Sequence, residues 1–306
     1  MSVEQRSGGV VALLDNGGSD SKKSSSYAMK VGMAQMLRGG VIVEVSNVEQ
    51  ARIAEAAGAI AVVAADETPM RPRAEAAIGV NRMTDPDVVR GIKQSVNIPV
   101  ISRARIGHFV EAQILEAVDV DFIDESEILS PADDKNFINK HNFRCPFVCG
   151  CKDLGGALRR VAEGAALVRT EGNRNGDIVE AVRSVRAVLG DVRRLQIIDE
   201  DELYTFAKHL SAPFELVKLT KQLGRLPVLV FGAGGIATPA DAAMMMQIGC
   251  DGIFIDSSVF VDSNPASRVR AFVQAVMNYN DSQILAKVNS SMADLDISDT
   301  DLVQSN

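Results

Sequence analysis

The residues most suited to chemistry follow or end a series of short apolar runs. The carboxylates and bases in these places are Glu44, Asp66, Glu67, Arg103, Arg105, Asp124, Glu125, Lys152, Asp153 and Glu171. If the runs are parallel strands, their carboxyl ends meet at one face and bring these side chains into a ring. Lys152 is the one lysine that this interpretation places at a strand end, where an amine could act as a nucleophile.

A glycine-rich stretch, FGAGGIATPADA at residues 231–242, predicts a phosphate site. Its glycines let the backbone approach an anion, and Thr238–Pro239 begins a helix whose amino end favours negative charge. The next apolar run ends at Asp256, before Ser257 and Ser258. The serines can donate hydrogen bonds, but the Asp256 carboxylate would repel a phosphate dianion. A turn-capping Asp256 and a phosphate-blocking Asp256 are about equally compatible with the sequence.

The same stretch weakly matches a dinucleotide-binding fingerprint. Gly232, Gly234 and Ala237 have its spacing, and Asp256 lies at a plausible distance for contact with a ribose. Only one strand follows the motif, however, whereas a dinucleotide-binding half needs three. This alternative is therefore the weaker one.

Other catalytic or metal-binding motifs are missing from the sequence or are better explained by structural roles. There is no nucleophile-elbow or zinc-protease motif, and the three histidines do not cluster. The four cysteines lack zinc-ribbon spacing, so buried reduced thiols are expected, with a redox role for Cys149 and Cys151 as the alternative. The Met244–Met246 run is expected in a helix core. We expect neither a metal nor a cofactor.

Eight β-rich runs provide the elements that must position these residues. They are mostly apolar rather than alternating, as in parallel strands buried on both faces, and they cover residues 41–45, 59–65, 98–102, 120–124, 146–150, 165–169, 227–231 and 252–256. Helical stretches separate them, with expected amino-terminal caps at Asp85, Asp153, Asp177, Thr238 and Asn264 and expected stops at Gly58, Gly164, Gly190 and Gly249.

Eight strand–helix units predict a single (β/α)8 TIM barrel over residues 28–291. A helix at 28–38 is expected outside its amino-terminal face, and the length of 170–226 predicts extra helices after the sixth strand. The polar stretch 125–145 is expected to be irregular, with room for a short helix. Residues 1–27 are expected to form a disordered arm, and 292–306 a flexible acidic tail.

Composition excludes several classes of protein. The net charge of −8 and the pI near 5.1 argue against nucleic acid as the main partner. No apolar run approaches the roughly 20 residues of a membrane span, and the first residues do not resemble a secretory signal. A cytoplasmic location is expected, without nucleic-acid or membrane partners.

Six motifs together resemble the synthase subunit of glutaminase-dependent pyridoxal 5′-phosphate (vitamin B6) synthase. They are RGGVIVEV, RARIGHFVEAQILEA, DFIDESEILSPAD, PFVCGCKDLGGALRR, EGAALVRTEG and GGIATPADAAMMMQIGCDGIF, and the resemblance extends from about residue 28 to 291. It implies a (β/α)8 barrel in two stacked hexameric rings. It also implies synthesis of the vitamer from ribose 5-phosphate, glyceraldehyde 3-phosphate and ammonia supplied by a separate glutaminase.

The resemblance fails at the positions that carry the family's chemistry. Family members have a sugar-contacting aspartate where this chain has Glu44. They have a Schiff-base lysine where it has Arg103, and a second lysine where it has Glu171. An arginine is not deprotonated and forms no imine, and a glutamate has no nitrogen to offer. No catalytic position is therefore intact, although Asp124 and His108 are retained.

The resemblance also marks the positions that would bind substrate phosphates. Gly235 and Ser257 are retained, and Arg186 matches an arginine that binds a second phosphate between subunits. Gly176 stands near the family's phosphate-binding glycine in a loop one residue shorter than usual, while Asp256 replaces another glycine. Lys152 matches a position that is commonly basic. The family's usual carboxyl-terminal ending, which helps to cover the active site, is missing.

This combination resembles the non-catalytic plant paralogues of the synthase subunit. It implies homo-oligomers, dodecamers above all, and mixed rings with catalytic paralogues in vitamin B6 biosynthesis. Binding of the glutaminase is an open expectation, because MKVGMAQMLRGG is largely retained. The alternative is an active barrel enzyme of the lyase class that acts on a phosphosugar with altered residues, Lys152 among them.

Overall fold

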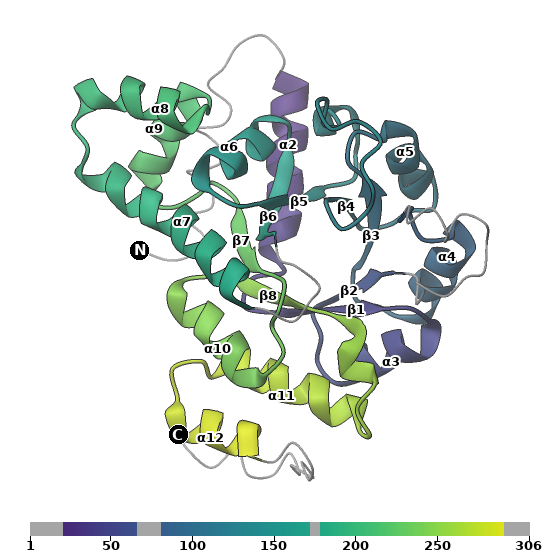
Figure 1. The fold of residues 1–306 in the computed structure, drawn as a ribbon. Coiled ribbons are helices and arrows are strands. Elements are labelled where there is room, and N and C mark those ends of the chain that lie inside the picture. Colours follow the sequence, from purple (N-terminus) through teal and green to yellow (C-terminus); the bar gives the residue numbers. More distant parts are fainter. Residues whose placement is uncertain (1–20, 66–80, 172–177, 291–306) are drawn as a thin grey trace.

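Eight parallel strands close into a barrel in chain order in the computed structural model, which describes residues 21–65, 81–171 and 178–290 (Figure 1). The strands are β1 (Val41–Val45), β2 (Ala61–Ala64), β3 (Val100–Arg105), β4 (Phe122–Ser126), β5 (Phe147–Cys151), β6 (Ala165–Thr170), β7 (Leu229–Gly232) and β8 (Gly252–Ile255). β1 pairs with both β2 and β8, which closes the barrel. The predicted (β/α)8 fold is confirmed, and the closed sheet shows that the dinucleotide-binding alternative is wrong.

Helices surround the barrel on its outside (Figure 1). They are α2 (Ser21–Gln35), α3 (Val48–Ala56), α4 (Pro86–Ser95), α5 (Phe109–Ala117), α6 (Leu154–Ala162), α7 (Ile178–Ile197), α8 (Leu203–Leu210), α9 (Phe214–Leu223), α10 (Pro239–Ile248), α11 (Pro265–Met277) and α12 (Ser282–Ser290). The described residues also form short 3-10 helices at η2 (Lys140–Asn142), η3 (Glu200–Glu202) and η4 (Ser257–Phe260). The strands are buried on both faces, which explains their apolar composition.

Most helix starts follow the predicted caps. Asp85, Asp153 and Asn264 each accept a backbone N–H in the first turn of the helix that follows, and Thr238 forms a capping box with Asp241. The predicted cap Asp177 lies outside the described residues.

Three of the predicted helix stops are found, and one is wrong. Gly58, Gly164 and Gly249 have positive φ angles just beyond helices. Gly190, by contrast, lies in the interior of α7. The packing of a twenty-residue amphipathic helix on the barrel outweighs the local cost of this glycine.

The helix α2 packs against the amino-terminal end of the barrel. The Tyr27 hydroxyl donates to the carbonyl of Ala165, the first residue of β6, at 2.9 Å, and Lys30 Nζ donates to the carbonyl of Lys140 at 3.0 Å. The predicted position is therefore right, but α2 begins at Ser21 and ends at Gln35 rather than covering 28–38. The segment expected to be disordered thus overlaps the helix at residues 21–27.

The long connection after β6 contains α7, η3, α8 and α9, as its length predicts. Figure 1 shows α7 along the outside of the barrel, with α8 and α9 at its far end. The polar stretch at 125–145 is irregular apart from η2, although its first two residues belong to β4.

Two aspartates brace the amino-terminal ends of neighbouring strands. Asp121, just before β4, accepts the backbone N–H of Val100 in β3 at 2.7 Å. Asp251, just before β8, accepts the N–H of Val230 in β7 at 2.9 Å. Each carboxylate also pairs with a cation, Lys93 or Arg38. These contacts fix the relative register of β3 with β4 and of β7 with β8.

All four cysteines are buried and free, as expected. Burial raises the pKa of Cys145 and of Cys151 to about 12, so neither thiol is ionised near neutral pH. In the part of the chain that the structure describes, no helix is long and apolar enough to cross a membrane.

Candidate active site

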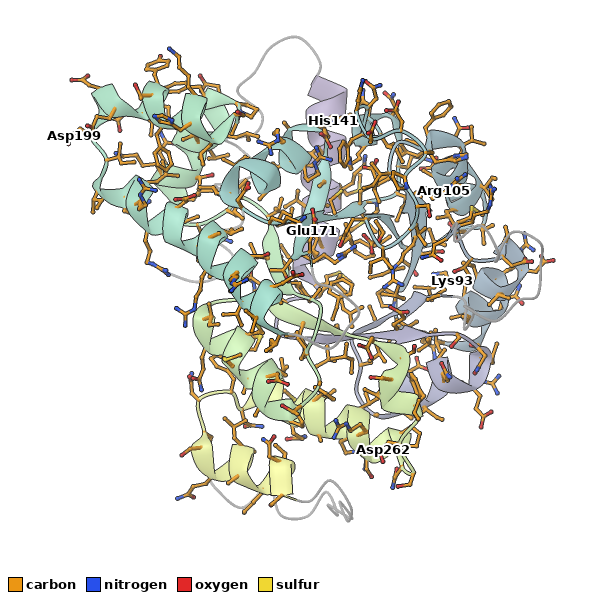
Figure 2. The ribbon with its side chains drawn as sticks, viewed as in Figure 1. Lys93, Arg105, His141, Glu171, Asp199 and Asp262 are labelled. Carbon is orange, nitrogen blue, oxygen red and sulfur yellow. The ribbon has the colours of Figure 1, made fainter. Side chains whose placement is uncertain are left out.

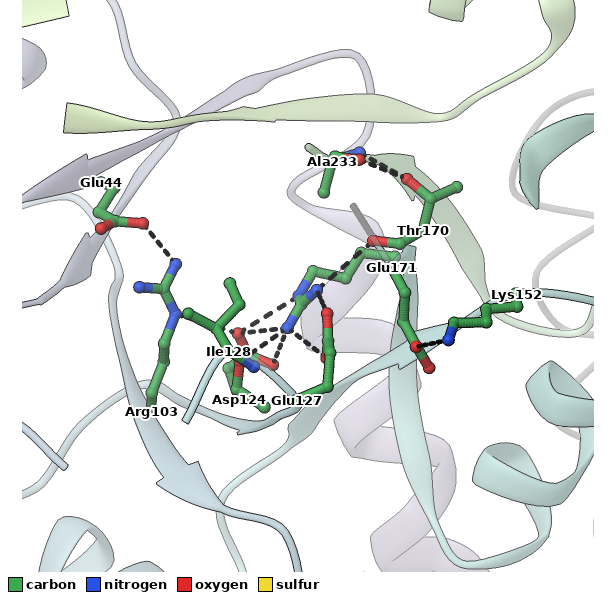
Figure 3. Close-up of polar contacts among 11 residues, drawn as sticks. Glu44, Arg103, Asp124, Glu127, Ile128, Lys152, Thr170, Glu171 and Ala233 are labelled. Atoms are coloured by element: carbon green, nitrogen blue, oxygen red, sulfur yellow. Dashed lines mark hydrogen bonds and ion pairs between the residues drawn. The ribbon is translucent and has the colours of Figure 1, made fainter. Parts of the chain in front are cut away.

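Charged side chains fill the carboxyl-terminal half of the barrel interior (Figure 3). Glu44 of β1, Arg103 of β3, Asp124 of β4 and Arg169 of β6 are all at most 9% exposed. The sequence places Arg103 just beyond its apolar run, and this is wrong, because β3 extends to Arg105. Glu44 and Asp124 lie within β1 and β4, inside the predicted runs 41–45 and 120–124. β3 and β4 continue past their apolar runs because the added charges find partners. Arg103 pairs with Glu44 inside the barrel, whereas Arg105 pairs with Glu111 of α5 and Glu125 with Lys140 of η2.

Arg103 is held between two carboxylates. Its Nη2 donates to Glu44 Oε2 at 2.6 Å, and its Nε lies 3.6 Å from Asp124 Oδ2. Burial lowers the pKa of the guanidinium, but the attraction and hydrogen bond of Glu44 outweigh burial, and the pKa is raised. The longer carboxylate at position 44 and the arginine at position 103 therefore complement each other as an ion pair.

Arg169 makes the densest set of contacts in the interior, and our sequence analysis does not identify it. Its Nη2 donates to Asp124 Oδ1 and Oδ2 at 3.1 Å and to the Ser126 hydroxyl at 2.9 Å. Its Nη1 donates to Glu127 Oε1 at 2.6 Å. The signal in the sequence is a lone cation in the apolar run AALVR. A buried arginine in a strand needs carboxylates from its neighbours, and the barrel supplies them.

Glu171 lies just beyond β6, where it pairs with Lys152 beyond β5. Lys152 Nζ is 3.3 Å from Glu171 Oε2, and the lysine side chain is 73% exposed. Burial raises the pKa of Glu171, and the nearby charge of Glu127 raises it further. Gly150 makes room for both glutamates, because a Cβ there would lie 2.4 Å from Glu127 Oε2 and 2.8 Å from Glu171 Cγ.

We expect Glu171→Gln to raise the melting temperature at pH 8 and to change it little at pH 4. The folded-state pKa of Glu171 lies above its ordinary value of 4.5, so folding favours the protonated form. The stability that this group contributes is full below the ordinary pKa and is lost as the pH rises through the raised one. Glutamine resembles the protonated form at every pH.

Thermal unfolding of both proteins between pH 4 and pH 8 tests this expectation. Glu49→Gln, a change of an exposed glutamate in α3, is the control. A difference in melting temperature that does not change with pH would contradict the assigned role of Glu171.

The glycine turn after β7, which we call the cradle, has the backbone conformation that the sequence predicts. Gly234 and Gly235 have φ angles of +86° and +67°, which favour glycine, and α10 begins four residues beyond Gly235. The backbone N–H groups of Gly234, Gly235 and Ile236 donate no hydrogen bond within the described part of the chain. They remain available to an anion.

Asp256 caps a turn and also lines the cavity beside the cradle. Its Oδ1 accepts the N–H of Ser258 at 2.9 Å and so caps η4, in which Ser257 lies. It also lines, with Glu44, Arg103 and the cradle, a cavity of about 50 Å³ between the described residues. Sites for small molecules usually measure about 300–1,000 Å³. This innermost space is therefore smaller than a usual site for a small molecule.

Carboxylates outnumber cations around this cavity and the adjoining strand ends. The carboxylates are Glu44, Asp124, Glu127, Glu171 and Asp256, and the cations are Arg103, Arg169 and Lys152. Each cation already pairs with at least one carboxylate. The cradle donors thus face an environment that disfavours a dianion.

The remaining predicted site residues lie apart from this cluster. His108 caps α5, because its Nδ1 accepts the N–H of Glu111 at 3.1 Å. Arg186 is exposed on the outer side of α7. Gly176 lies outside the described residues. Of the sequence-predicted set, the barrel therefore brings together Glu44, Arg103, Asp124, Gly235 and Asp256.

Comparisons with known proteins agree with this architecture. The SOR/SNZ family model matches residues 26–233, and a second model, the thiazole biosynthesis protein ThiG, matches residues 207–293. A probable pyridoxal 5′-phosphate synthase subunit PDX1 of Ginkgo biloba is 61% identical, with 94% of this chain and 93% of the relative covered.

Two proteins of Arabidopsis thaliana provide a further comparison. Pyridoxal 5′-phosphate synthase subunit PDX1.3 is 58% identical over 94% of this chain and 92% of its own length. Pyridoxal 5′-phosphate synthase-like subunit PDX1.2 is 53% identical over 95% and 91%. The family model covers most of the barrel, and the relatives match this chain over nearly its whole length. The chain therefore belongs to the SOR/SNZ family, that of the pyridoxal 5′-phosphate synthase subunits.

Proposed function

We propose that this chain serves vitamin B6 biosynthesis as a subunit that lacks the imine chemistry and supports catalytic paralogues in shared assemblies. Membership of the synthase subunit family supports the role in the pathway. The observation that carries the non-catalytic part is the state of the two positions where the resemblance expects lysines. Arg103 is buried between Glu44 and Asp124, and Glu171 is paired with Lys152.

Neither position can form an imine with a sugar aldehyde. Imine formation needs a neutral amine, and the Arg103 guanidinium is held in its charged form by the adjacent carboxylates. Glu171 carries no nitrogen. Lys152 is the one amine near the site in the described residues, and its Nζ lies 3.3 Å from Glu171 Oε2 with the side chain 73% exposed, outside the buried interior.

Incubation with ribose 5-phosphate, reduction with borohydride and intact-mass measurement test this part of the proposal. We expect the mass of the chain to stay unchanged, while a catalytic family member treated in parallel gains a pentose adduct. An adduct on this chain would contradict the proposal. Loss of that adduct in Lys152→Arg would then identify Lys152 as the nucleophile and favour an altered enzyme.

Co-assembly with catalytic paralogues is supported by what the chain retains outside the chemistry. The barrel, the α7–α9 insertion and the packing of α2 are all present. A subunit of this kind stabilises an assembly by mass action when it occupies positions in the same ring. Native mass spectrometry after co-expression with a catalytic subunit should show mixed oligomers. Separate homomeric species, or a 32.7 kDa monomer alone, would contradict co-assembly.

The exposed side of α2 supports docking of the glutaminase. Met29, Met33 and Met36 follow helical spacing and are 64%, 40% and 71% exposed. Flexible methionine side chains suit an apolar protein contact. Addition of the glutaminase to the same mass-spectrometric samples shows whether this surface binds it.

A further inference from the structure

The small cavity beside the cradle combines charged and apolar walls. It has a volume of about 50 Å³ and lies between the cradle and residues of β1, β3, β6 and β8. Four charged side chains line it: Glu44, Arg103, Arg169 and Asp256. Figure 3 shows Glu44 and Arg103 facing each other in the barrel interior. The chemistry of this lining indicates which kind of ligand the cavity can hold.

The charges that line the cavity cancel one another. Two guanidiniums, those of Arg103 and Arg169, accompany two carboxylates, those of Glu44 and Asp256. Asp124, behind the lining, pairs with both arginines and so compensates them further. The guanidiniums would repel a cationic ligand, and the Asp256 carboxylate beside the cradle would repel a phosphate dianion. A neutral ligand meets neither repulsion.

Hydrogen-bonding groups of both kinds remain unused around the cavity. Arg103 is 6% exposed, and its Nη1 donates no hydrogen bond to any described residue. The cradle N–H groups are unused as well, and on their own they would suit an anion. Asp256 caps η4 with Oδ1, whereas its Oδ2 accepts no hydrogen bond from the described part of the chain. A hydroxyl group both accepts and donates, so it matches this mixture of donors and acceptors.

The rest of the cavity wall is apolar. Ile236, Phe254 and Ile255 line it and are at most 8% exposed. Water forms no hydrogen bond with such a wall, whereas the carbon atoms of an organic ligand bury apolar surface against it. Hydroxyl groups for the polar side and carbon atoms for the apolar side are the two properties of a polyol.

The volume of the cavity limits the size of the ligand. One water needs roughly 10–15 Å³ of such space, so about 50 Å³ corresponds to about four waters. A three-carbon polyol is close to this limit, and the exposed Asp256 marks the side on which a terminal hydroxyl can reach solvent. A ligand this small binds weakly, with a Kd on the order of millimolar.

We propose that this cavity binds a small neutral polyol of about three carbons and that Asp256 selects the polyol over its phosphate ester. One hydroxyl accepts from the cradle N–H groups and donates to Asp256 Oδ2, and a second hydroxyl faces Arg103. The carbon chain packs against Ile236 and Phe254. The proposal rests on the proposed function in one respect: the polyol is bound and released unchanged, because the imine chemistry is absent.

A ligand-observed NMR titration of the full chain tests this site, with glycerol and glycerol 3-phosphate as a matched pair of probes. The saturation-transfer signal of glycerol should saturate with a millimolar Kd. Glycerol 3-phosphate should displace glycerol only at a concentration at least tenfold higher than a neutral competitor needs. Asp256→Asn preserves the shape of the cap and removes its charge. In that variant glycerol 3-phosphate should displace glycerol at least tenfold more readily than in the wild type.

Asp262→Asn is the matched control, because it removes a carboxylate from the same loop without changing the cavity lining. Asp262 precedes α11, and its Oδ2 lies 3.9 Å from Arg268 Nε. Figure 2 shows Asp262 beside α11, away from Glu171 in the middle of the barrel. The control should displace glycerol from the site with the same preference as the wild type.

Three results would overturn the polyol site. These are a lack of saturable glycerol binding, displacement by glycerol 3-phosphate as readily as by a neutral competitor, and an unchanged preference in Asp256→Asn. A change in Asp262→Asn as large as that in Asp256→Asn would also overturn it, since the effect would then be one of overall charge. The two proposals fail separately. A trapped pentose adduct would remove the proposed function and leave glycerol binding in place, whereas absent glycerol binding would leave the proposed function in place.

Discussion

Asp124→Asn is expected to lower the free energy of unfolding by about 3–5 kcal/mol. Asp124 is fully buried and compensates Arg169 at 3.1 Å as well as Arg103 at 3.6 Å. Asparagine preserves the shape of the side chain but removes its charge, so two buried guanidiniums lose a shared counter-ion. Urea unfolding at pH 7 measures the change as a lower midpoint with an unchanged slope.

The matched control is an ion pair on the surface. Asp87→Asn in α4 removes the partner of Arg90, and these side chains are 87% and 50% exposed. We expect a loss of less than about 1 kcal/mol, because solvent screens exposed pairs. If Asp124→Asn cost no more than this control, the interior charges would not form the interdependent set described above.

Restoring four positions together is expected to recover a trapped pentose adduct that restoring two does not. The four-site variant is Glu44→Asp, Arg103→Lys, Glu171→Lys and Asp256→Gly, and the two-site variant changes only positions 103 and 171. In the two-site variant Glu44 remains within ion-pair distance of the new lysine and favours its charged form. Asp256 remains beside the free N–H groups of the cradle and repels the sugar phosphate.

Borohydride trapping with ribose 5-phosphate followed by intact mass compares the variants. We expect at least tenfold more adduct on the four-site variant than on the two-site variant. Lys152→Arg in the four-site background is the control and should leave the adduct in place. Equal trapping by both variants would show that Glu44 and Asp256 do not limit the chemistry.

The barrel could be predicted from the sequence because burial on both faces leaves a direct mark on strand composition. Each of the eight apolar runs corresponds to a strand, and helix caps such as Thr238 depend on local hydrogen bonds that spacing alone reveals. The extents of β3 and β4 could not be predicted in the same way. Both strands continue into charged residues, Arg105 in β3 and Glu125 in β4. The partners that neutralise these charges lie on other elements, Glu111 of α5 and Lys140 of η2, and the runs themselves do not reveal them.

The candidate site could be predicted from the sequence where the type of residue alone decides the chemistry. A missing amine is visible in the sequence, so the absence of lysine at positions 103 and 171, where the resemblance expects one, can be read from residue type alone. The ion pairs that now occupy these places depend on which strands face one another across the barrel. Arg169 shows this limit, since nothing in its own run indicates that Asp124 and Glu127 would surround it.

The hydrogen bonds of Asp121 and Asp251 belong to a longer set of features that recur in the two halves of the barrel. Each accepts the N–H of a residue 21 positions earlier in the chain. The helices α5 and α10 likewise begin with equivalent caps, His108 and Thr238, each accepting an N–H three residues on. Positive-φ residues, Asp119 and Gly249, follow these helices. The same number of residues separates the two members of every such pair.

The barrel therefore contains one βαβ design twice, once in each half, and the two copies have specialised differently. At the amino end of α10 the glycine N–H groups are unused and open to the cavity. In the other half the residue equivalent to Gly235 is Arg105, and its backbone N–H donates to Glu111 Oε2 of α5 at 2.9 Å. In one half, a carboxylate of the chain itself thus accepts the hydrogen bond from the backbone N–H. In the other half, the equivalent N–H stays free for an anion from outside.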